Sequence, residues 1–249
     1  MPKIPFPLRK VTKDVAHKQL EILEGMYPRA ETALAFSNPF ELIIAVILSA
    51  QCTDVRENMT TPTLFKKYPT AEKLAKAKQE DVEHIIKSCG FFRTKARNII
   101  NCARELVQKH AGEVPREREQ LEALAGVGRK SASVVMSVVF EEAAIAVDTH
   151  VFRVSHRLGL TLGKTPRDVE EDLEQLVPRE NWRHAHHWLI EHGRAICKAP
   201  IPLCGRCPVN ALCPSVKIVA KTLGVRDLPG AADAGARRPA RSSSAKKKA

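Results

Sequence analysis

The chain has 249 residues and a formal net charge of +12, and only 5% of its residues are aromatic. No apolar run approaches the roughly 20 residues of a membrane span, and the first ten residues lack the apolar core of a secretory signal. The last 21 residues hold six basic side chains against one acidic one, so most of the positive charge belongs to the rest of the chain. We expect a soluble, cytoplasmic protein without a membrane role, and its basic body favours a nucleic-acid partner.

Helix signals recur along the sequence, and Ala, Leu, Glu, Lys and Arg are abundant. Asn38 followed by Pro39 predicts a capped start for a nearly all-apolar helix, which we expect to be central to a core. Thr165 and Asp168 predict a capping box at another helix start, and Gly90 predicts a helix end. Helices are expected over residues 14–27, 39–50, 81–89, 93–110 and 166–177.

The most informative stretch is LAGVGRKSA at residues 124–132, followed by VDTH at 147–150. A Gly-x-Gly turn that opens a helix points N–H groups outward and suits a phosphate oxygen. Lys130 would lie in the first turn of this helix, where the dipole and partial burial disfavour its ammonium form. It is therefore a candidate imine-forming nucleophile. Asp148 is a lone carboxylate at an expected helix start.

These signals also have simpler readings, because Gly-x-Gly turns are common and a first-turn lysine is ordinarily solvated. A nucleotide-binding P-loop is excluded, since that motif reads Gly-x-x-x-x-Gly-Lys-Ser/Thr and Gly126 precedes Lys130 by only four positions. From the residues alone, Gln51 in SAQCTD suggests a cap for the next helix, and Phe91 in GFFRTKA suggests core packing. Four clustered histidines are explained more simply as core and surface residues than as metal ligands: His184, His186, His187 and His192.

Four cysteines at residues 197–213 follow the pattern C-x6-C-x2-C-x5-C, namely Cys197, Cys204, Cys207 and Cys213. In a cytosolic chain such a cluster indicates metal binding rather than disulfides. Zinc ribbons normally use two C-x2-C knuckles, whereas this loop has one. Four thiolates from one segment can also hold a cubane iron–sulfur cluster. Spacing alone leaves zinc and iron–sulfur open. Cys52, Cys89 and Cys102 are scattered and are expected to be small core residues.

LAGVGRKSA followed by VDTHV resembles the helix-hairpin-helix and Gly/Pro-Asp segment of the endonuclease III family of DNA glycosylases. The resemblance extends over residues 14–216 and includes the cysteine pattern. It implies that Lys130 and Asp148 are catalytic and that the four cysteines bind a 4Fe–4S cluster. It also implies that Gln51 fills the space left by a flipped nucleotide and that Phe91 is an apolar wedge. The implied DNA contacts are Gln51, Phe91, Gly126, Gly128, Arg129 and His150.

The fold implied by the resemblance is all-α, with two helical domains flanking a DNA-binding cleft. Residues 32–142 would form a six-helix domain that contains the hairpin. Residues 1–31 and 143–228 would form the iron–sulfur cluster domain, and residues 229–249 a disordered basic tail. Lys130 would then face Asp148 across the cleft.

The implied activity is that of a bifunctional DNA glycosylase and AP lyase of base excision repair. It would remove oxidised pyrimidines from duplex DNA as a nucleoid-associated monomer, and it would nick the abasic site by β-elimination through a lysine imine. Mismatch-specific glycosylases share the fold, but adenine-specific ones lack the lysine and carry an extra C-terminal domain, and thymine-specific ones also differ at the lysine. From another class, the alternative is a non-catalytic hairpin protein with structural zinc, which would be colourless rather than brown.

Overall fold

The computed structural model describes residues 4–226 and residue 228, and this part of the chain contains helices and no β-strand. None of these helices is long and apolar enough to cross a membrane. The basic tail predicted for residues 229–249 lies outside the described residues. The α-helices are α1 (Lys13–Met26), α2 (Pro39–Ser49), α3 (Asp54–Lys67), α4 (Ala71–Ala75), α5 (Gln79–Ile85), α6 (Phe92–His110), α7 (Arg118–Glu122), α8 (Arg129–Val139), α9 (Thr149–Leu158), α10 (Pro166–Leu176), α11 (Trp182–Ala195) and α12 (Ser215–Leu223).

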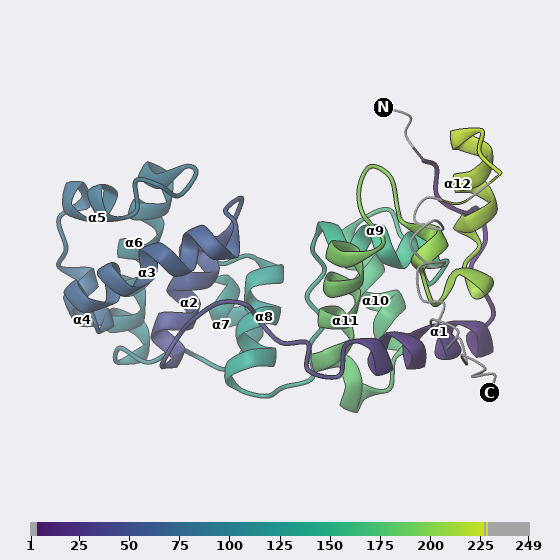
Figure 1. Cartoon of the computed structure of the whole chain (residues 1–249). Coiled ribbons are helices and arrows are strands. Elements are labelled where there is room, and N and C mark those ends of the chain that lie inside the picture. Colours follow the sequence, from purple (N-terminus) through teal and green to yellow (C-terminus); the bar gives the residue numbers. More distant parts are fainter. Residues whose placement is uncertain (1–3, 227, 229–249) are drawn as a thin grey trace, which may run out of the picture.

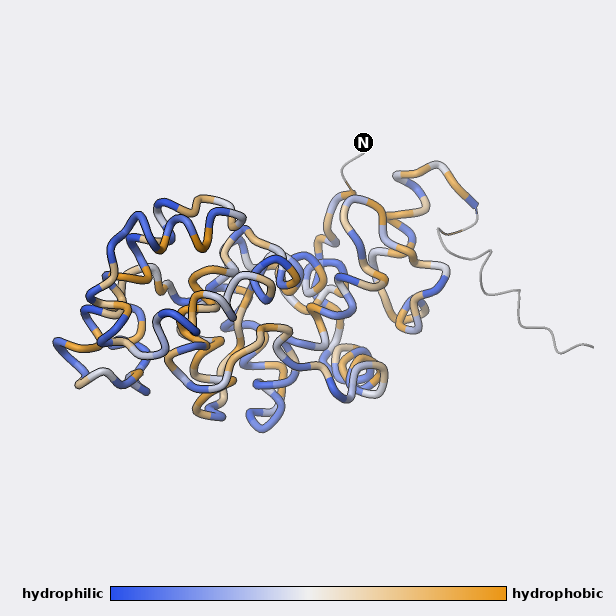
Figure 2. Tube along the Cα trace, turned by 60° about the vertical axis from the view of Figure 1, so that its left-hand side comes forward, coloured by the Kyte–Doolittle hydropathy of each residue, from blue (hydrophilic) through white to orange (hydrophobic). Residues whose placement is uncertain are grey.

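The helices form two lobes (Figure 1), with α2–α8 in the first and α1 joined to α9–α12 in the second. Two segments run between the lobes, one between α1 and α2 and the other between α8 and α9. Hydrophobic stretches alternate with hydrophilic ones along the helices of both lobes (Figure 2). This pattern is expected when each helix buries one face in its own lobe.

The core of the first lobe is built around α2. Asn38 caps this helix by accepting from the Glu41 backbone N–H at 2.9 Å, and Pro39 occupies its first turn as predicted. Eight of its eleven residues are buried, so it is apolar on every side rather than amphipathic. Buried residues of this core run from Phe40 to Val135.

The core of the second lobe combines two distant parts of the sequence. Its buried residues come from 16–30 and from 145–209. The predicted capping box is present, because the Thr165 side chain accepts from the Asp168 N–H and Asp168 accepts from that of Thr165. A small third cluster joins Ile4 to Cys204 and Val219, so the N-terminal segment packs against the cysteine loop. The first core lies within the predicted domain of residues 32–142, and the second lies within residues 1–31 and 143–228. The domain boundaries themselves remain a prediction.

Two expectations differ from the structure. The first lobe has seven helical segments where the resemblance implies six, and two of them, α4 and α7, have only five residues each. The helix expected over residues 81–89 instead spans Gln79–Ile85 and ends before Gly90. Residues 86–91 form turns, with the Cys89 N–H donating to the Ile86 carbonyl at 2.8 Å. The left-handed backbone expected at a helix-ending glycine is found one residue later, at Phe91.

Glu57 on α3 is fully buried, and within the described residues neither of its carboxylate oxygens has a hydrogen-bond partner. Burial, assisted by the nearby Asp54, raises the pKa of Glu57 from 4.5 to about 7. The folded state therefore holds a proton that the unfolded chain loses near pH 4.5. Stability must fall as the pH rises from about 4.5 to 7, and it stays reduced above that range.

Glu57→Gln is expected to raise the free energy of unfolding by about 3 kcal/mol at pH 8, because one pKa unit corresponds to 1.36 kcal/mol. At pH 5 the two proteins should differ little, since the carboxyl group is protonated in the fold. Urea unfolding at both pH values measures the difference, with the exposed Glu80→Gln as the matched control. An equal gain at both pH values would mean that ionisation of Glu57 is not its cause.

Candidate functional site

A cleft of about 690 Å³ brings the two predicted catalytic residues together. Lys130 comes from α8 in the first lobe, and Asp148 comes from the start of α9 in the second. The same cleft is lined by Gln51 and His150. A smaller extension of about 90 Å³ also contains Lys130 and Asp148, together with His186 and His187.

Lys130 is the second residue of α8. Gly128 precedes the helix in extended conformation, and no side chain caps this helix start. The backbone N–H groups of the first turn are thus available to an anion. A Cβ at Gly128 would meet nothing within 4 Å, so a ligand can approach this side of the backbone. Partial burial of Lys130 was expected, and this is wrong, because its position at the cleft leaves it exposed.

Gly126 has a different role from Gly128. Its φ of +82° lies in the left-handed region, and a Cβ there would be 2.9 Å from the Cβ of Asn98 on α6 and 3.2 Å from Cγ2 of Ile47 on α2. A side chain would therefore clash with Asn98 and crowd Ile47. Gly126 fixes the hairpin turn against the first lobe, and this in turn places the start of α8.

Asp148 is the N-cap of α9. Its Oδ1 accepts from the backbone N–H groups of His150 and Val151, both at 2.8 Å. Because one oxygen takes both bonds, the carboxylate is fixed in orientation while Oδ2 is left for the cleft. The His150 Nδ1 contacts Nη2 of Arg153 at 3.2 Å. Burial is the main cause that lowers the pKa of His150, and Asp148 opposes it.

The deeper part of the cleft contains neutral histidines. Burial lowers the pKa of His186 to about 3, and the charge of Lys130 is among the further causes. Burial also lowers the pKa of His187 to about 4, and Asp148 acts in the opposite direction. Both rings are uncharged at neutral pH, so they are suited to contact an uncharged ligand. Within the described residues, no group of three or more His, Cys, Asp or Glu is arranged to hold a single metal ion.

Arg194 is a cleft residue that the sequence analysis missed. It lines both parts of the cleft and donates through Nη2 to Oδ2 of Asp54 at 2.7 Å, which joins α11 to α3. The partners are 140 positions apart, so no local pattern relates them. Asp54 belongs to SAQCTD, but the cap of α3 is Thr53, whose hydroxyl accepts from the Arg56 N–H.

Gln51 and Phe91 occupy two neighbouring turns. Both have left-handed backbone, with φ of 53° and 55°, and both are exposed, Phe91 by 69%. A Cβ at Gly90 would be 3.3 Å from the Gln51 carbonyl oxygen, so the backbones of the turns touch. Core packing is thus ruled out for Phe91. Left-handed conformation at non-glycine residues is strained and is common at binding sites.

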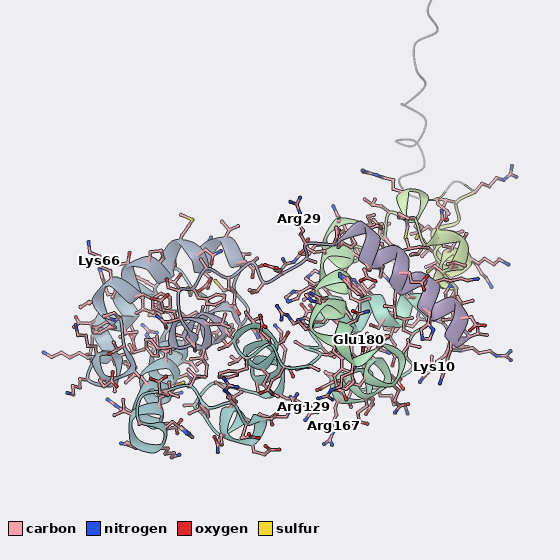
Figure 3. All side chains as sticks on the ribbon, turned by 90° about the horizontal axis from the view of Figure 1, so that it is seen from below. Lys10, Arg29, Lys66, Arg129, Arg167 and Glu180 are labelled. Carbon is pink, nitrogen blue, oxygen red and sulfur yellow. The ribbon has the colours of Figure 1, made fainter. Side chains whose placement is uncertain are left out.

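Arg129, at the start of α8, lies between the two lobes (Figure 3). Its Nε and Nη2 donate to the two carboxylate oxygens of Glu170 on α10, at 2.7 and 3.1 Å. Glu170 has a side chain only 4% exposed and also pairs with Arg118 at 3.8 Å. The Arg129 side chain is 38% exposed, and its two parallel hydrogen bonds fix the pair more firmly than a single surface contact would. The Arg129 side chain therefore joins the lobes, and it is not among the residues that line the cleft.

The four clustered cysteines surround one small cavity beneath α12, and they are Cys197, Cys204, Cys207 and Cys213. Burial raises the pKa of Cys204 to about 11 and the pKa values of Cys207 and Cys213 to about 12, with neighbouring thiols among the further causes. The four cysteine side chains thus line the same cavity. Arg157 reaches the same cavity, and its Nη1 is 3.7 Å from the Cys197 sulfur.

Comparison with known proteins identifies similar chains. Residues 44–179 match the model of the HhH-GPD superfamily base excision DNA repair protein. Endonuclease III of Synechocystis is 46% identical over 213 residues, which cover 84% of this chain and 97% of that protein. Endonuclease III of Bacillus subtilis is 49% identical over 195 residues, which cover 78% and 89%. The solved structure of a trapped endonuclease III–DNA covalent intermediate aligns with a TM-score of 0.81 at 46% identity, covering 83% and 98%.

Proposed function

Because the chain belongs to the HhH-GPD superfamily and, within it, to the endonuclease III family of DNA N-glycosylases and AP lyases, we propose that Lys130 and Asp148 carry its chemistry. The protein is a base excision repair enzyme, and its fold is that of the endonuclease III structures. The observation that supports the assignment is the meeting of one lysine from the first lobe with one carboxylate from the second in a single cleft.

In the proposed reaction, a damaged pyrimidine nucleotide leaves the duplex and enters the cleft. The Lys130 amine attacks C1′ of the sugar as the bond from C1′ to the base breaks. The Asp148 carboxylate stabilises the positive charge that develops on the sugar and assists proton transfer. The lysine adduct opens to an imine, and β-elimination breaks the bond to the 3′ phosphate. Water then hydrolyses the imine and frees Lys130.

The open start of α8 would hold the DNA phosphates. Gly128 leaves the backbone accessible, and the first-turn N–H groups have no side-chain cap. Since Arg129 is engaged with Glu170, its contribution to DNA binding is proposed to come from its backbone N–H. His150 lines the cleft beside Asp148 and is proposed as a further contact. Such contacts give affinity without sequence preference. The enzyme would act as a nucleoid-associated monomer.

Gln51 and Phe91 are proposed to enter the duplex from their two adjoining turns. Phe91→Ala is expected to slow base release from a paired lesion by on the order of tenfold, because the wedge no longer replaces lost base stacking. Nicking of a preformed abasic site should change much less, since opening that site requires less work. Single-turnover assays on both duplexes measure the effect. Val55→Ala, at an exposed apolar residue of α3, is the control, and equal losses on both duplexes would exclude a role in strand opening.

The four cysteines are proposed to hold a 4Fe–4S cluster. All four cysteines line one cavity, which is the arrangement that supports the proposal, because four thiolates from one segment can hold such a cluster. When bound, the group would act structurally, by holding the loop of residues 197–213 against α9. Lys198 and Arg206 in this loop can then face phosphate.

Cys204→Ser is expected to give protein with little iron and low solubility, because the loop has few other apolar anchors. Iron analysis and the brown absorption of the purified protein measure the loss. The matched control is Cys102→Ser, at a buried cysteine of α6 outside the cluster. Four irons per chain in Cys204→Ser would contradict the ligand assignment.

The experiment that tests the proposed function is borohydride trapping on a panel of duplexes with damaged bases. A covalent complex is expected with oxidised pyrimidines and with abasic sites, and base release should accompany it. Duplexes without damage should give no complex. Release without trapping would indicate a glycosylase that uses water as its nucleophile, and failure of both would refute the assignment of catalytic residues.

A further inference from the structure

Two cysteines outside the cluster lie at the turns that carry Gln51 and Phe91. Cys52 directly follows Gln51, and Cys89 is separated from Phe91 by Gly90 alone. The turns touch at the Gln51 carbonyl, and Cys52 packs against the core cluster that contains Cys89. Cys89 is 1% exposed, whereas Cys52 is half-buried and lines the 690 Å³ cleft. A small solute in the cleft can therefore reach one thiol of the pair.

A buried lysine lies one helical turn after Phe91, where its backbone N–H donates to the Phe91 carbonyl oxygen at 3.0 Å. Lys95 on α6 is 5% exposed, and its Nζ has no hydrogen-bond partner within the described residues. Burial lowers the pKa of Lys95, and Cys52 and Cys89 are the groups that oppose this. Burial also raises the pKa of Cys89, and the Cys52 thiol is the next cause. An unpaired buried amine is unfavourable in a purely structural site, but it is suited to exchange a proton with a thiol.

We propose that Cys52 and Cys89 are a redox modification site, at which a peroxide converts the two thiols to a reversible disulfide with Lys95 as the proton carrier. Lys95 takes the proton of Cys52, and the thiolate attacks one oxygen of hydrogen peroxide. An S–O bond forms as the O–O bond breaks, and Lys95 returns the proton to the leaving hydroxide, which becomes water. Cys89 then attacks this sulfenic acid, the S–S bond forms, and a second water leaves. Two thiols lose two electrons in all, and the peroxide is reduced to two waters.

The disulfide would tie the Gln51 turn to the Phe91 turn. If these turns enter DNA, as the proposed function holds, the bond restrains the movement that lets two side chains insert from neighbouring positions. Oxidation would then slow base release from duplex DNA, and reduction would restore it. The covalent chemistry itself does not depend on that function.

The test uses the holoprotein treated with hydrogen peroxide, followed by alkylation of free thiols, proteolysis and mass spectrometry. The expected product is one cross-linked peptide pair joining Cys52 to Cys89, which disappears with dithiothreitol. Cys102→Ala should keep this cross-link, and Cys89→Ala should lack it. Lys95→Met should slow its formation by about tenfold or more. If Lys95→Met fails to fold, mass spectrometry of the unaltered protein still tests whether the Cys52–Cys89 disulfide forms. Absence of that cross-link would overturn the proposal.

The functional consequence is measured separately, as base release before and after peroxide. The unaltered enzyme should lose activity and regain it with dithiothreitol, whereas Cys89→Ala should be insensitive. Equal, irreversible loss in both would indicate damage elsewhere, such as at the cluster cysteines, and would refute the effect of the disulfide. Because the cross-link is mapped without substrate, a chain that forms it but releases no base would contradict the proposed function alone.

Discussion

Lys130→Gln is expected to abolish the covalent complex that borohydride traps between this protein and lesion-containing DNA. An amide cannot form an imine, so both base release through the lysine and strand nicking should fall, by on the order of 10³-fold or more. DNA binding should remain largely intact, because the proposed phosphate contacts are backbone N–H groups at the start of α8. Trapping, single-turnover nicking and a binding titration on the same duplex measure the three quantities.

Two features of the structure make this test selective. Lys130 is exposed at the cleft, so the replacement removes no core packing and should leave the unfolding transition unchanged. Lys66 lies at the outer end of the first lobe (Figure 3), and Lys66→Gln removes one positive charge far from the cleft. It should trap as the unaltered protein does. Persistent trapping by Lys130→Gln would overturn its assignment and indicate another amine.

Asp148→Asn is expected to reduce base release by about 10²–10³-fold, while nicking of a preformed abasic site falls less. The carboxylate stabilises a positive charge that develops only while the base departs, and such fixed charges matter most in a water-poor cleft. On an abasic site no base must leave, so that stabilisation is less needed. Comparing single-turnover rates on the two substrates separates this electrostatic role from the nucleophilic role of Lys130.

The N-cap position of Asp148 provides the control for this variant. Oδ1 accepts two backbone hydrogen bonds at the start of α9, and asparagine caps helices about as well as aspartate. Asp148→Asn should therefore keep the stability of the fold, whereas Asp148→Ala should lose about 1 kcal/mol as well as activity. If Asp148→Asn released the base at the normal rate and Asp148→Ala did not, the aspartate would be only a helix cap.

The sequence predicted those features that short stretches determine. The cap at Asn38, the capping box at Thr165 and the helix start at Asp148 depend on residues within four positions of one another, and all three are present. The helix end at Gly90 was wrong, although glycine is a common local signal for it. Gly90 instead packs closely against the Gln51 turn. Such a contact between distant residues cannot be predicted from the residues next to Gly90 in the sequence.

The contacts that join the lobes could not be predicted, because their partners are far apart in sequence. Arg129 and Glu170 are 41 positions apart, and Asp54 and Arg194 are 140 apart. The resemblance implies that Arg129 is a DNA contact, whereas its guanidinium is bound to Glu170. The unpaired Lys95 was also missed, since alternation of polar and apolar residues predicts a face of a helix but not whether a partner is present.

The order in which the chain is synthesised matters for an enzyme of this construction. The core of the first lobe is complete in sequence by Val135, so this lobe can fold while the ribosome is still adding residues. The second core cannot form until the residues up to Val209 have been synthesised, because α1 packs against them. Lys130 is thus exposed on a folded lobe well before Asp148 is fixed opposite it. A nascent chain would hold the nucleophile without its electrostatic partner, and efficient base release would become possible only after the residues up to Val209 have been added.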